Sequence, residues 1–418
     1  MNGLFWIIVF ALIADFIIRS VSTIVNVRSM RPSPPSGLDG IYETEGYRKS
    51  QEYIRVQSRF GLMTTSLRLV GSLVFWFAGG FNYIDHVVRL IGWNEISNGI
   101  LFFGVFAVLV AIVNMPADLY STFVIEERFG FNKTTYKTFF LDAFKSILLS
   151  AVIGIPVLVG VLFFFEYTGT LSWLYAWIFT IAITLVLSMI GPIWIMPLFN
   201  KFIPLGSGEL RDAIVGYASS VNFTYGNIYV IDGSKRSAHS NAFFTGFGKT
   251  KRIALFDTLI EQLNTDEIVS VIAHEVGHSK KKHIMSGMAL GILHVGALLG
   301  LFSLVMKEQV LFDAFFMDEV SIYASLMFFG FMLTPIELLI SPAIQYISRR
   351  HEYQADQWAV ATTADRGTLV SGLKMLAAKN LANLSPHPFF VMLNYSHPPL
   401  SKRIRAIQIQ VTGNTKDR

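Results

Sequence analysis

The sequence predicts a mainly α-helical, polytopic membrane protein that carries a smaller α+β domain. Of its 418 residues, 52% are hydrophobic and only 15% are charged, a balance that soluble domains rarely show. A helix needs about 20 apolar residues to cross the hydrocarbon of a membrane. Seven stretches meet that length, and they are residues 3–25, 62–83, 98–118, 146–166, 171–192, 284–306 and 321–346.

The first stretch lacks the basic segment and the small-residue cleavage site of a signal peptide, so we expect an uncleaved span. The fifth stretch ends at Pro192 and Pro197, which stop or bend a helix. Charged and polar side chains inside hydrocarbon are costly unless they face water or a partner. Snorkelling is expected for Arg19 and Arg68, near span ends. For His294 and Glu337, snorkelling and a water-filled interior both remain open.

The loops between the spans differ in positive charge. Residues 26–60 carry six Lys or Arg and residues 119–145 carry four, whereas 84–97 and 307–320 carry one each. Because cytoplasmic loops are enriched in Lys and Arg, the positive loops are expected in the cytoplasm. The segments on the same side, 193–283 and 347–418, are then cytoplasmic too. The modest net charge of +5 favours loops facing anionic lipid and gives no sign of nucleic-acid binding.

The segment before the sixth span is predicted to be globular. Short β-type runs at 227–232, 241–247 and 252–257 are separated by turn residues. A helix follows, with Asn264 or Thr265 as its cap, acidic residues in its first turn and lysines at its end. No repeat or low-complexity tract stands out.

That helix contains His-Glu-x-x-His, with His274 and His278 one turn apart and Glu275 beside the first histidine. Two imidazoles at this spacing can reach one zinc ion, while the glutamate is placed to hold a water. The chain has no cysteine, which excludes thiolate ligands, disulfides and a cysteine nucleophile. A solvated helix with surface histidines is the alternative, but apolar flanks indicate a buried helix, where unpartnered histidines are costly.

A catalytic zinc needs a third protein ligand and an open position. "SRRHEYQADQWAV" (348–360) offers Glu352 and Asp356, again four residues apart. One of them is expected to bind the metal and the other to accept an N–H from a ligating histidine. An ordinary charged helix remains the alternative. Two membrane helices run out and back between the two motifs, so both motifs can return to one surface.

Together, "HEVGH", "SRRHEYQAD", "YSHPPLSKRI", "FVIEERFGFNKTT" and "KRSAHSNAFFTGFGKTKRIALFDTLI" resemble the integral-membrane zinc metalloproteases of the CAAX prenyl protease type 1 family. The resemblance covers about residues 40–405. It implies a seven-helix membrane barrel around a chamber, closed by a thermolysin-like α+β protease domain on the cytoplasmic side. We expect a membrane domain at 1–205 and a protease domain at 206–418, which two membrane helices interrupt.

The resemblance also implies individual roles. It makes His274, His278 and Glu352 the ligands of one zinc ion, Glu275 the base, and Asp356 the partner of a ligating histidine. Asn241 and Ala242 match a strand whose edge pairs with substrate, and by themselves they predict only a plain strand. His397 and Arg403 match a pair near the scissile carbonyl, although their stretch alone is a Pro-rich loop before a basic tail. Four other histidines match no ligand and receive no metal role: His239, His283, His351 and His387.

The resulting expectation is a zinc-dependent membrane endopeptidase that releases the C-terminal tripeptide from prenylated CAAX proteins or peptides. A membrane quality-control metalloprotease is the alternative among enzymes, and a transporter or receptor is the alternative outside them. The expected partners are a peptide or prenylated protein C-terminus and the lipid bilayer, without nucleic acid, and the protein is expected to be a monomer. The expected location is the endoplasmic reticulum membrane of a eukaryote or the inner membrane of a bacterium, with the active site facing the cytoplasm.

Overall fold

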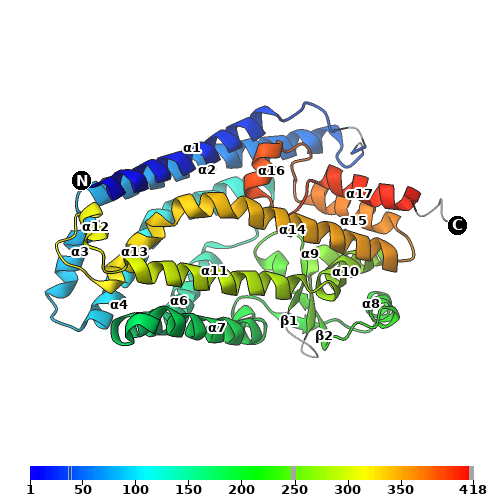
Figure 1. Cartoon of the computed structure of the whole chain (residues 1–418). Coiled ribbons are helices and arrows are strands. Elements are labelled where there is room, and N and C mark those ends of the chain that lie inside the picture. Colours follow the sequence, from blue (N-terminus) through cyan, green and yellow to red (C-terminus); the bar gives the residue numbers. More distant parts are fainter. Residues whose placement is uncertain (36, 39, 246–250, 414–418) are drawn as a thin grey trace.

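Long helices lie roughly side by side along the molecule, and a small sheet with short helices gathers at one end (Figure 1). The N-terminus lies at the opposite end from this sheet. This computed structural model describes residues 1–35, 37–38, 40–245 and 251–413. The arrangement separates a membrane-like body from a compact domain, as the composition predicts.

Six helical segments are long and apolar enough to cross a membrane, and each overlaps a predicted span. The third continues through a π-helical turn, η1 (Ser121–Glu126), and α5 (Glu127–Phe129). The fifth ends in a π turn and a 3₁₀ turn at Pro192 and Pro197, as predicted. The six are α1 (Gly3–Arg28), α2 (Thr44–Phe77), the segment Glu95–Phe129 that starts with α4 (Glu95–Tyr120), α6 (Tyr136–Tyr167), the segment Gly169–Leu198 around α7 (Ser172–Ile190), and α11 (His283–Val305).

Two predicted spans need correction. The seventh, 321–346, is not one straight helix but α13 (Ile322–Met332) and α14 (Thr334–Thr362), bent by 55°. Pro335 lacks an N–H to continue the ladder of α13, which explains a break at this point. The second, 62–83, ends earlier, at Phe77, because Gly79 has a φ of 74° and starts a new helix, α3 (Gly80–Arg89).

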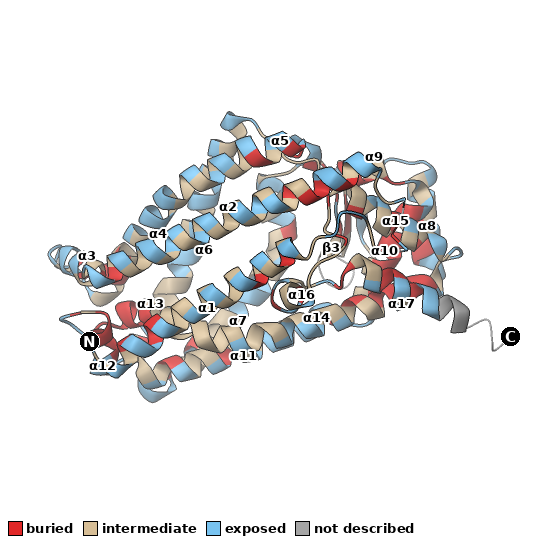
Figure 2. Ribbon diagram, turned by 90° about the horizontal axis from the view of Figure 1, so that it is seen from above, coloured by how far each residue is buried: buried red, intermediate tan, exposed pale blue. Residues whose placement is uncertain are grey.

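Buried side chains gather at the two ends of the spans (Figure 2). In α2 the buried residues are Trp76 at one end and four residues between Tyr47 and Tyr53 at the other. In α6 they begin only at Val161. Only 6–17% of the most apolar window of each span is buried. Middle sections that contact each other so little are expected of helices that splay around an interior space.

The end away from the sheet is held by an aromatic core. Trp76 is fully buried, stacks on Phe315 and donates its indole N–H to the carbonyl of Ala314, 3.0 Å away. The short helix α12 (Gln309–Ala314) and α3 close this end. Tight packing here fixes the distances between spans that lie far apart in the sequence and that run toward the sheet at the other end.

The sheet at the other end has four strands in the order β1-β2-β4-β3. β2 and β4 are parallel, and the two outer pairs are antiparallel. The three predicted strands are confirmed, although residues 246 and 247 of the predicted run 241–247 lie outside the described residues. β3 pairs only with β4, so it is an edge strand. The strands are β1 (Phe202–Pro204), β2 (Asn227–Ile231), β3 (Ala242–Thr245) and β4 (Arg252–Phe256).

Short helices pack around this sheet and form a second core with it. Figure 2 shows the buried residues of this domain along α10, α15 and α17. The helices are α8 (Glu209–Ser220), α9 (Asp257–Gln262), α10 (Thr265–Lys280), α15 (Gly367–Lys379), α16 (Pro388–Asn394) and α17 (Leu400–Gly413). Because α14 runs from the membrane body into this core, the two parts share one rigid element.

Candidate active site

α10 holds both histidines of the motif on one face. The predicted cap is Asn264, whose side chain accepts the N–H of Glu267 while the Glu267 carboxylate accepts the N–H of Asn264. Buried apolar residues cover the opposite face, including Ile268 and Ile272. The helix is therefore fixed at its start and along its length, and it holds His274 and His278 at one turn's spacing.

α14 brings the third donor to these histidines. Nε2 of His274 and Nε2 of His278 lie 3.2 Å apart, and the Glu352 carboxylate oxygens lie 3.4 Å and 3.3 Å from them. The three side chains form a group that could hold a metal ion. His274 and Glu352 are buried, with 7% and 4% of their surface exposed. Of the two carboxylates left open by the sequence, Glu352 is thus the one that faces both ring nitrogens.

The spacing of the three donors fits a tetrahedral ion. Ligands at about 2.0–2.1 Å from zinc lie about 3.3 Å from one another in a tetrahedron, which matches the observed separations. One Glu352 oxygen, Oε2, is buried and accepts no hydrogen bond from any described residue. A buried carboxylate oxygen without a donor is costly, and a cation removes that cost. Two nitrogens and one oxygen are a donor set that zinc accepts.

Asp356 contacts Nδ1 of His274, and Arg403 contacts Asp356. Nδ1 of His274 lies 2.9 Å from Asp356 Oδ1, so the ring can donate to this carboxylate while Nε2 faces the metal group. Arg403 donates to both oxygens of Asp356, at 2.6 Å and 2.8 Å. Its third nitrogen lies 3.7 Å from Glu352. The guanidinium is buried and balances the two carboxylates.

Two groups on α10, His274 and Glu275, have pKa values that their surroundings shift. Burial lowers the pKa of His274, but contacts to Asp356 and Glu352 outweigh burial and hold the pKa at about 9. Burial raises the pKa of the Glu275 carboxyl above its usual range, which brings the group closer to a general base that works near neutrality.

A cavity of about 430 Å³ joins the metal group to the edge strand. Glu275 and His397 line it, and His397 Nε2 lies 3.3 Å from Glu352. Asn241 is exposed and Ala242 is buried, and both line the cavity next to the free edge of β3. Three leucines of α15 form an apolar wall of the cavity: Leu369, Leu373 and Leu376. The sequence does not predict this wall, because any amphipathic helix has such an apolar stripe.

The structure thus brings nearly all the predicted site residues together. His274, Glu352 and Arg403 line the same cavity. His278 faces Glu352, and Asp356 faces Nδ1 of His274. Each of these roles was a prediction from spacing or resemblance, and the geometry is compatible with each.

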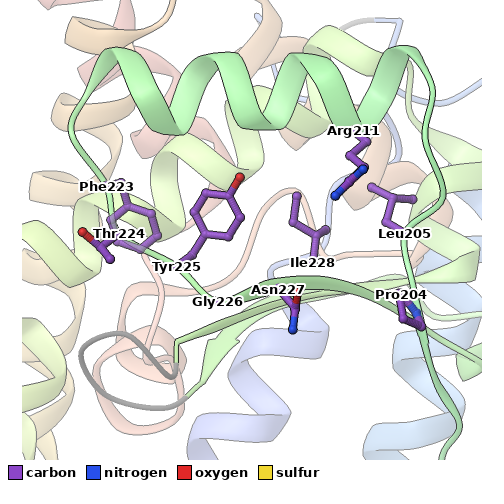
Figure 3. A pocket seen from close by; sticks show the side chains of 9 residues that line it. All are labelled: Pro204, Leu205, Arg211, Phe223, Thr224, Tyr225, Gly226, Asn227 and Ile228. Atoms are coloured by element: carbon purple, nitrogen blue, oxygen red, sulfur yellow. The ribbon is translucent and has the colours of Figure 1, made fainter.

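A second cavity, of about 350 Å³, lies between α8 and β2 (Figure 3). Arg211 is its only charged lining residue, and the lining contains no histidine or carboxylate. All of the lining side chains are labelled in Figure 3. Its described lining therefore lacks the histidine and carboxylate ligands of a zinc site.

Polar residues inside the spans have partners within the protein. His294 Nε2 lies 3.0 Å from Glu337, which joins α11 to α14. Arg68 donates to Asn114 at 2.9 Å, and joins α2 to α4. His294 and Glu337 therefore contact each other. The two alternatives from the sequence, snorkelling and a water-filled interior, did not include this pair.

The fold and site define a membrane-embedded metallopeptidase: apolar helices long enough to span a membrane carry a domain with a His-Glu-x-x-His helix and a third carboxylate donor. Two family models match consecutive parts of the chain. Residues 23–201 match "CAAX prenyl protease N-terminal, five membrane helices" and residues 204–411 match "Peptidase family M48". The chain belongs to peptidase family M48.

Relatives match nearly the whole chain. CAAX prenyl protease 1 of Saccharomyces cerevisiae is 36% identical and covers 89% of this chain and 88% of its own length. A CAAX prenyl protease 1 homologue of Arabidopsis thaliana is 37% identical, with 90% of each chain covered. The crystal structure of S. mikatae Ste24p has a TM-score of 0.92 and 34% identity, and covers 97% of this chain and 99% of its own. The solved relative shares the fold of this chain over nearly its whole length.

Proposed function

We propose that this protein is a zinc-dependent endopeptidase that cleaves prenylated CAAX proteins or peptides and releases their C-terminal tripeptide. The observation that carries the proposal is a single cavity lined by His274 and Glu352 of the metal group, by Glu275 and by Ala242 of the edge strand β3. We assign one zinc ion per chain, held by His274, His278 and Glu352.

When bound, zinc would polarise the scissile carbonyl and acidify the attacking water. Glu275 lies on the same helix as the two histidines and lines the cavity, where it takes the proton of the water and passes it to the leaving amine. Among the described residues, no hydrogen bond or ion pair joins Glu275 to His274, His278 or Glu352. Glu352, in contrast, faces the Nε2 atoms of both histidines. The two glutamates therefore have separate roles, base and ligand.

The substrate peptide is proposed to lie extended along β3. An edge strand can pair with an added strand through its unpaired backbone groups. Asn241 and Ala242 lie where this edge meets the cavity. His397, 63% exposed at its side chain, is placed to donate to the developing oxyanion, while buried Arg403 contributes positive charge behind it.

The substrate class rests on the cavity and on the relatives. The leucine wall of α15 suits the aliphatic side chains of a CAAX tail. The sparse packing of the spans leaves room for a chamber that receives the lipid. Binding of the lipid away from the scissile bond would improve positioning at the metal. Relatives named CAAX prenyl protease 1 cover about nine-tenths of this chain, which disfavours the quality-control alternative.

The orientation in the membrane, the domain boundary and the oligomeric state belong to the same proposal. The positively charged loops and the catalytic domain are assigned to the cytoplasmic face of the endoplasmic reticulum membrane, or of the inner membrane in a bacterium. The chain divides into a membrane domain at 1–205 and a protease domain at 206–418, and it acts as a monomer.

The proposal is tested with purified protein and two peptides that differ only in a prenyl group on the cysteine. Mass spectrometry should find one cut, directly after the modified cysteine, and kcat/KM should be higher for the prenylated peptide. His397→Ala should lower kcat for both peptides alike, because its contact is with the reacting carbonyl.

Glu261→Gln is the matched control, since Glu261 is an exposed glutamate on α9 outside the cavity. It should cleave like the unchanged protein. Equal kcat/KM for the two peptides, or cuts scattered through an unfolded protein, would favour quality control instead.

A further inference from the structure

The second metal-binding histidine also has a partner behind it. Nδ1 of His278 lies 3.1 Å from Nδ1 of His283, the first residue of α11. A histidine that binds a metal through one ring nitrogen almost always donates the N–H of the other to an acceptor. Asp356 takes that role for His274. We infer that His283 takes it for His278, and that His283 is a positioning residue for the metal site.

The protons along this chain of contacts are consistent with one another. A ring nitrogen that binds metal carries no proton, so His278 must carry its proton on Nδ1 and donate it. Nδ1 of His283 then accepts, and the proton of His283 is on Nε2. That Nε2 lies 2.8 Å from the side-chain oxygen of Gln354, an acceptor. Gln354 therefore fixes the tautomer of His283 that His278 needs.

The backbone places His283 for this contact. α10 ends at Lys280, and Lys282 has a φ of 59°, an uncommon conformation for a residue with a side chain. This turn brings His283 back against His278. His283 is buried, and His351 of α14 stacks on its ring at 4.0 Å with an 8° angle between planes. The imidazole is thus held on its face by His351 and at its edge by Gln354.

His283 is not itself a ligand. Among the described residues, the donor group contains His274, His278 and Glu352 only. His283 and Gln354 do not line the substrate cavity. A change at His283 therefore acts on the metal through His278 and leaves the substrate contacts in place.

The test measures how fast zinc leaves the loaded, purified protein when a chelator is added. His283→Leu removes the acceptor and should speed release about 10–100-fold. His283→Asn keeps an acceptor near the Nδ1 position and should stay close to the unchanged protein. His351→Phe, which keeps the stacking partner but has no ring nitrogen, is the matched control and should also release zinc at the original rate.

Cobalt substitution adds a signature that a general loss of stability would not produce. The visible bands of cobalt should change in His283→Leu and not in His283→Asn. If His283→Leu does not fold, Gln354→Leu gives the second variant, with faster release and a smaller effect than the loss of His283. Unchanged release in His283→Leu, or equally fast release from His283→Leu and His283→Asn, would overturn the inference.

The inference rests on the proposed function, in which His278 is a ligand, and the two can fail separately. His278→Ala should retain no zinc after dialysis. If it does retain zinc, the proposed site itself is wrong. If His278→Ala loses zinc while His283→Leu behaves like the unchanged protein, only the role of His283 is wrong.

Discussion

Glu275 and Glu352 are chemically identical side chains near the same two histidines, and their surroundings separate their roles. Glu352 is 4% exposed and faces two ring nitrogens. Glu275 is half-buried and lines the cavity. A carboxylate aimed at the donors of a cation suits a ligand, and one with access to substrate suits a base.

Glu275→Gln should therefore keep its metal and lose about 10²–10⁴-fold in kcat, because the amide cannot accept a proton. Metal content by atomic absorption and turnover on the same sample check both parts. Loss of metal as complete as in His278→Ala would show that base and ligand are wrongly assigned.

At the scale of elements, the site depends on how closely α10 approaches α14. Gly277, which directly precedes His278, faces Ala355 and Trp358 of α14. A Cβ at Gly277 would lie 3.0 Å from the Ala355 backbone and from the Trp358 side chain. An added Cβ would require the backbone of α14 to shift, so glycine favours this close approach of α10, which carries the histidines, to α14, which carries Glu352.

Gly277→Ala should lower the free energy of unfolding by about 1–3 kcal/mol, because backbone cannot move aside as a side chain does. It should also weaken metal binding, since α10 and α14 carry different ligands. Gly287→Ala is the control, because nothing lies within 4 Å of a Cβ there. Thermal unfolding and a metal titration measure the two effects, and equal behaviour of both variants would contradict the packing argument.

A second set of contacts joins the membrane body to the loop before β3. Glu126 of η1 accepts hydrogen bonds from Tyr53 and Gln57 of α2, at 2.9 Å and 3.0 Å. Its other oxygen lies 3.6 Å from His239, which also contacts Asn380. The contact with Glu126 raises the pKa of His239 above its ordinary value. The ion pair thus ties the loop before β3 to α2.

Because the pKa of His239 is higher in the folded state, its pairing stabilises the fold below about pH 6.5, the unfolded value. This stabilisation is lost as the pH rises through the folded pKa. Glu126→Gln should therefore lower the Tm more at pH 6 than at pH 8.5, in scans of unfolding in detergent. Exposed Glu45→Gln should show no such difference, and a pH-independent effect of Glu126→Gln would exclude the ion pair.

At the scale of the molecule, packed cores at two ends hold helices whose middle sections contact each other little. The long bent segment α13–α14 passes from one core to the other. It begins among the aromatic residues of the distal core and ends with Glu352 in the metal group. Connections from the spans to the domain that holds the site run through α14 and α11, and also through the contact of Glu126 with His239.

The charge count predicts that the two ends face opposite sides of the membrane. Single cysteines in this cysteine-free chain test that directly: Glu308→Cys before α12 and Ala364→Cys after α14, both at exposed positions. In sealed vesicles an impermeant maleimide should label one and not the other. Labelling of both from one side would exclude the arrangement with seven crossings.

The sequence alone determines the local features of this protein. The apolar stretches predict the spans because length and hydropathy suffice for a helix in lipid. The His-Glu-x-x-His spacing predicts two ligands because a helix has a fixed period. Asn264 predicts the start of α10 because a cap acts within one turn.

Tertiary structure decides whatever depends on contacts between distant segments. Spacing could not choose between Glu352 and Asp356, since both lie on one face of α14. In the structure Glu352 faces the Nε2 atoms of both histidines, whereas Asp356 faces Nδ1 of His274. The break before Pro335 and the pairing of His294 with Glu337 depend on neighbouring helices. His283 shows the limit most clearly. Residues five apart do not lie on the same face of a helix, so the separation from His278 predicts no contact. The turn at Lys282 brings the two rings together.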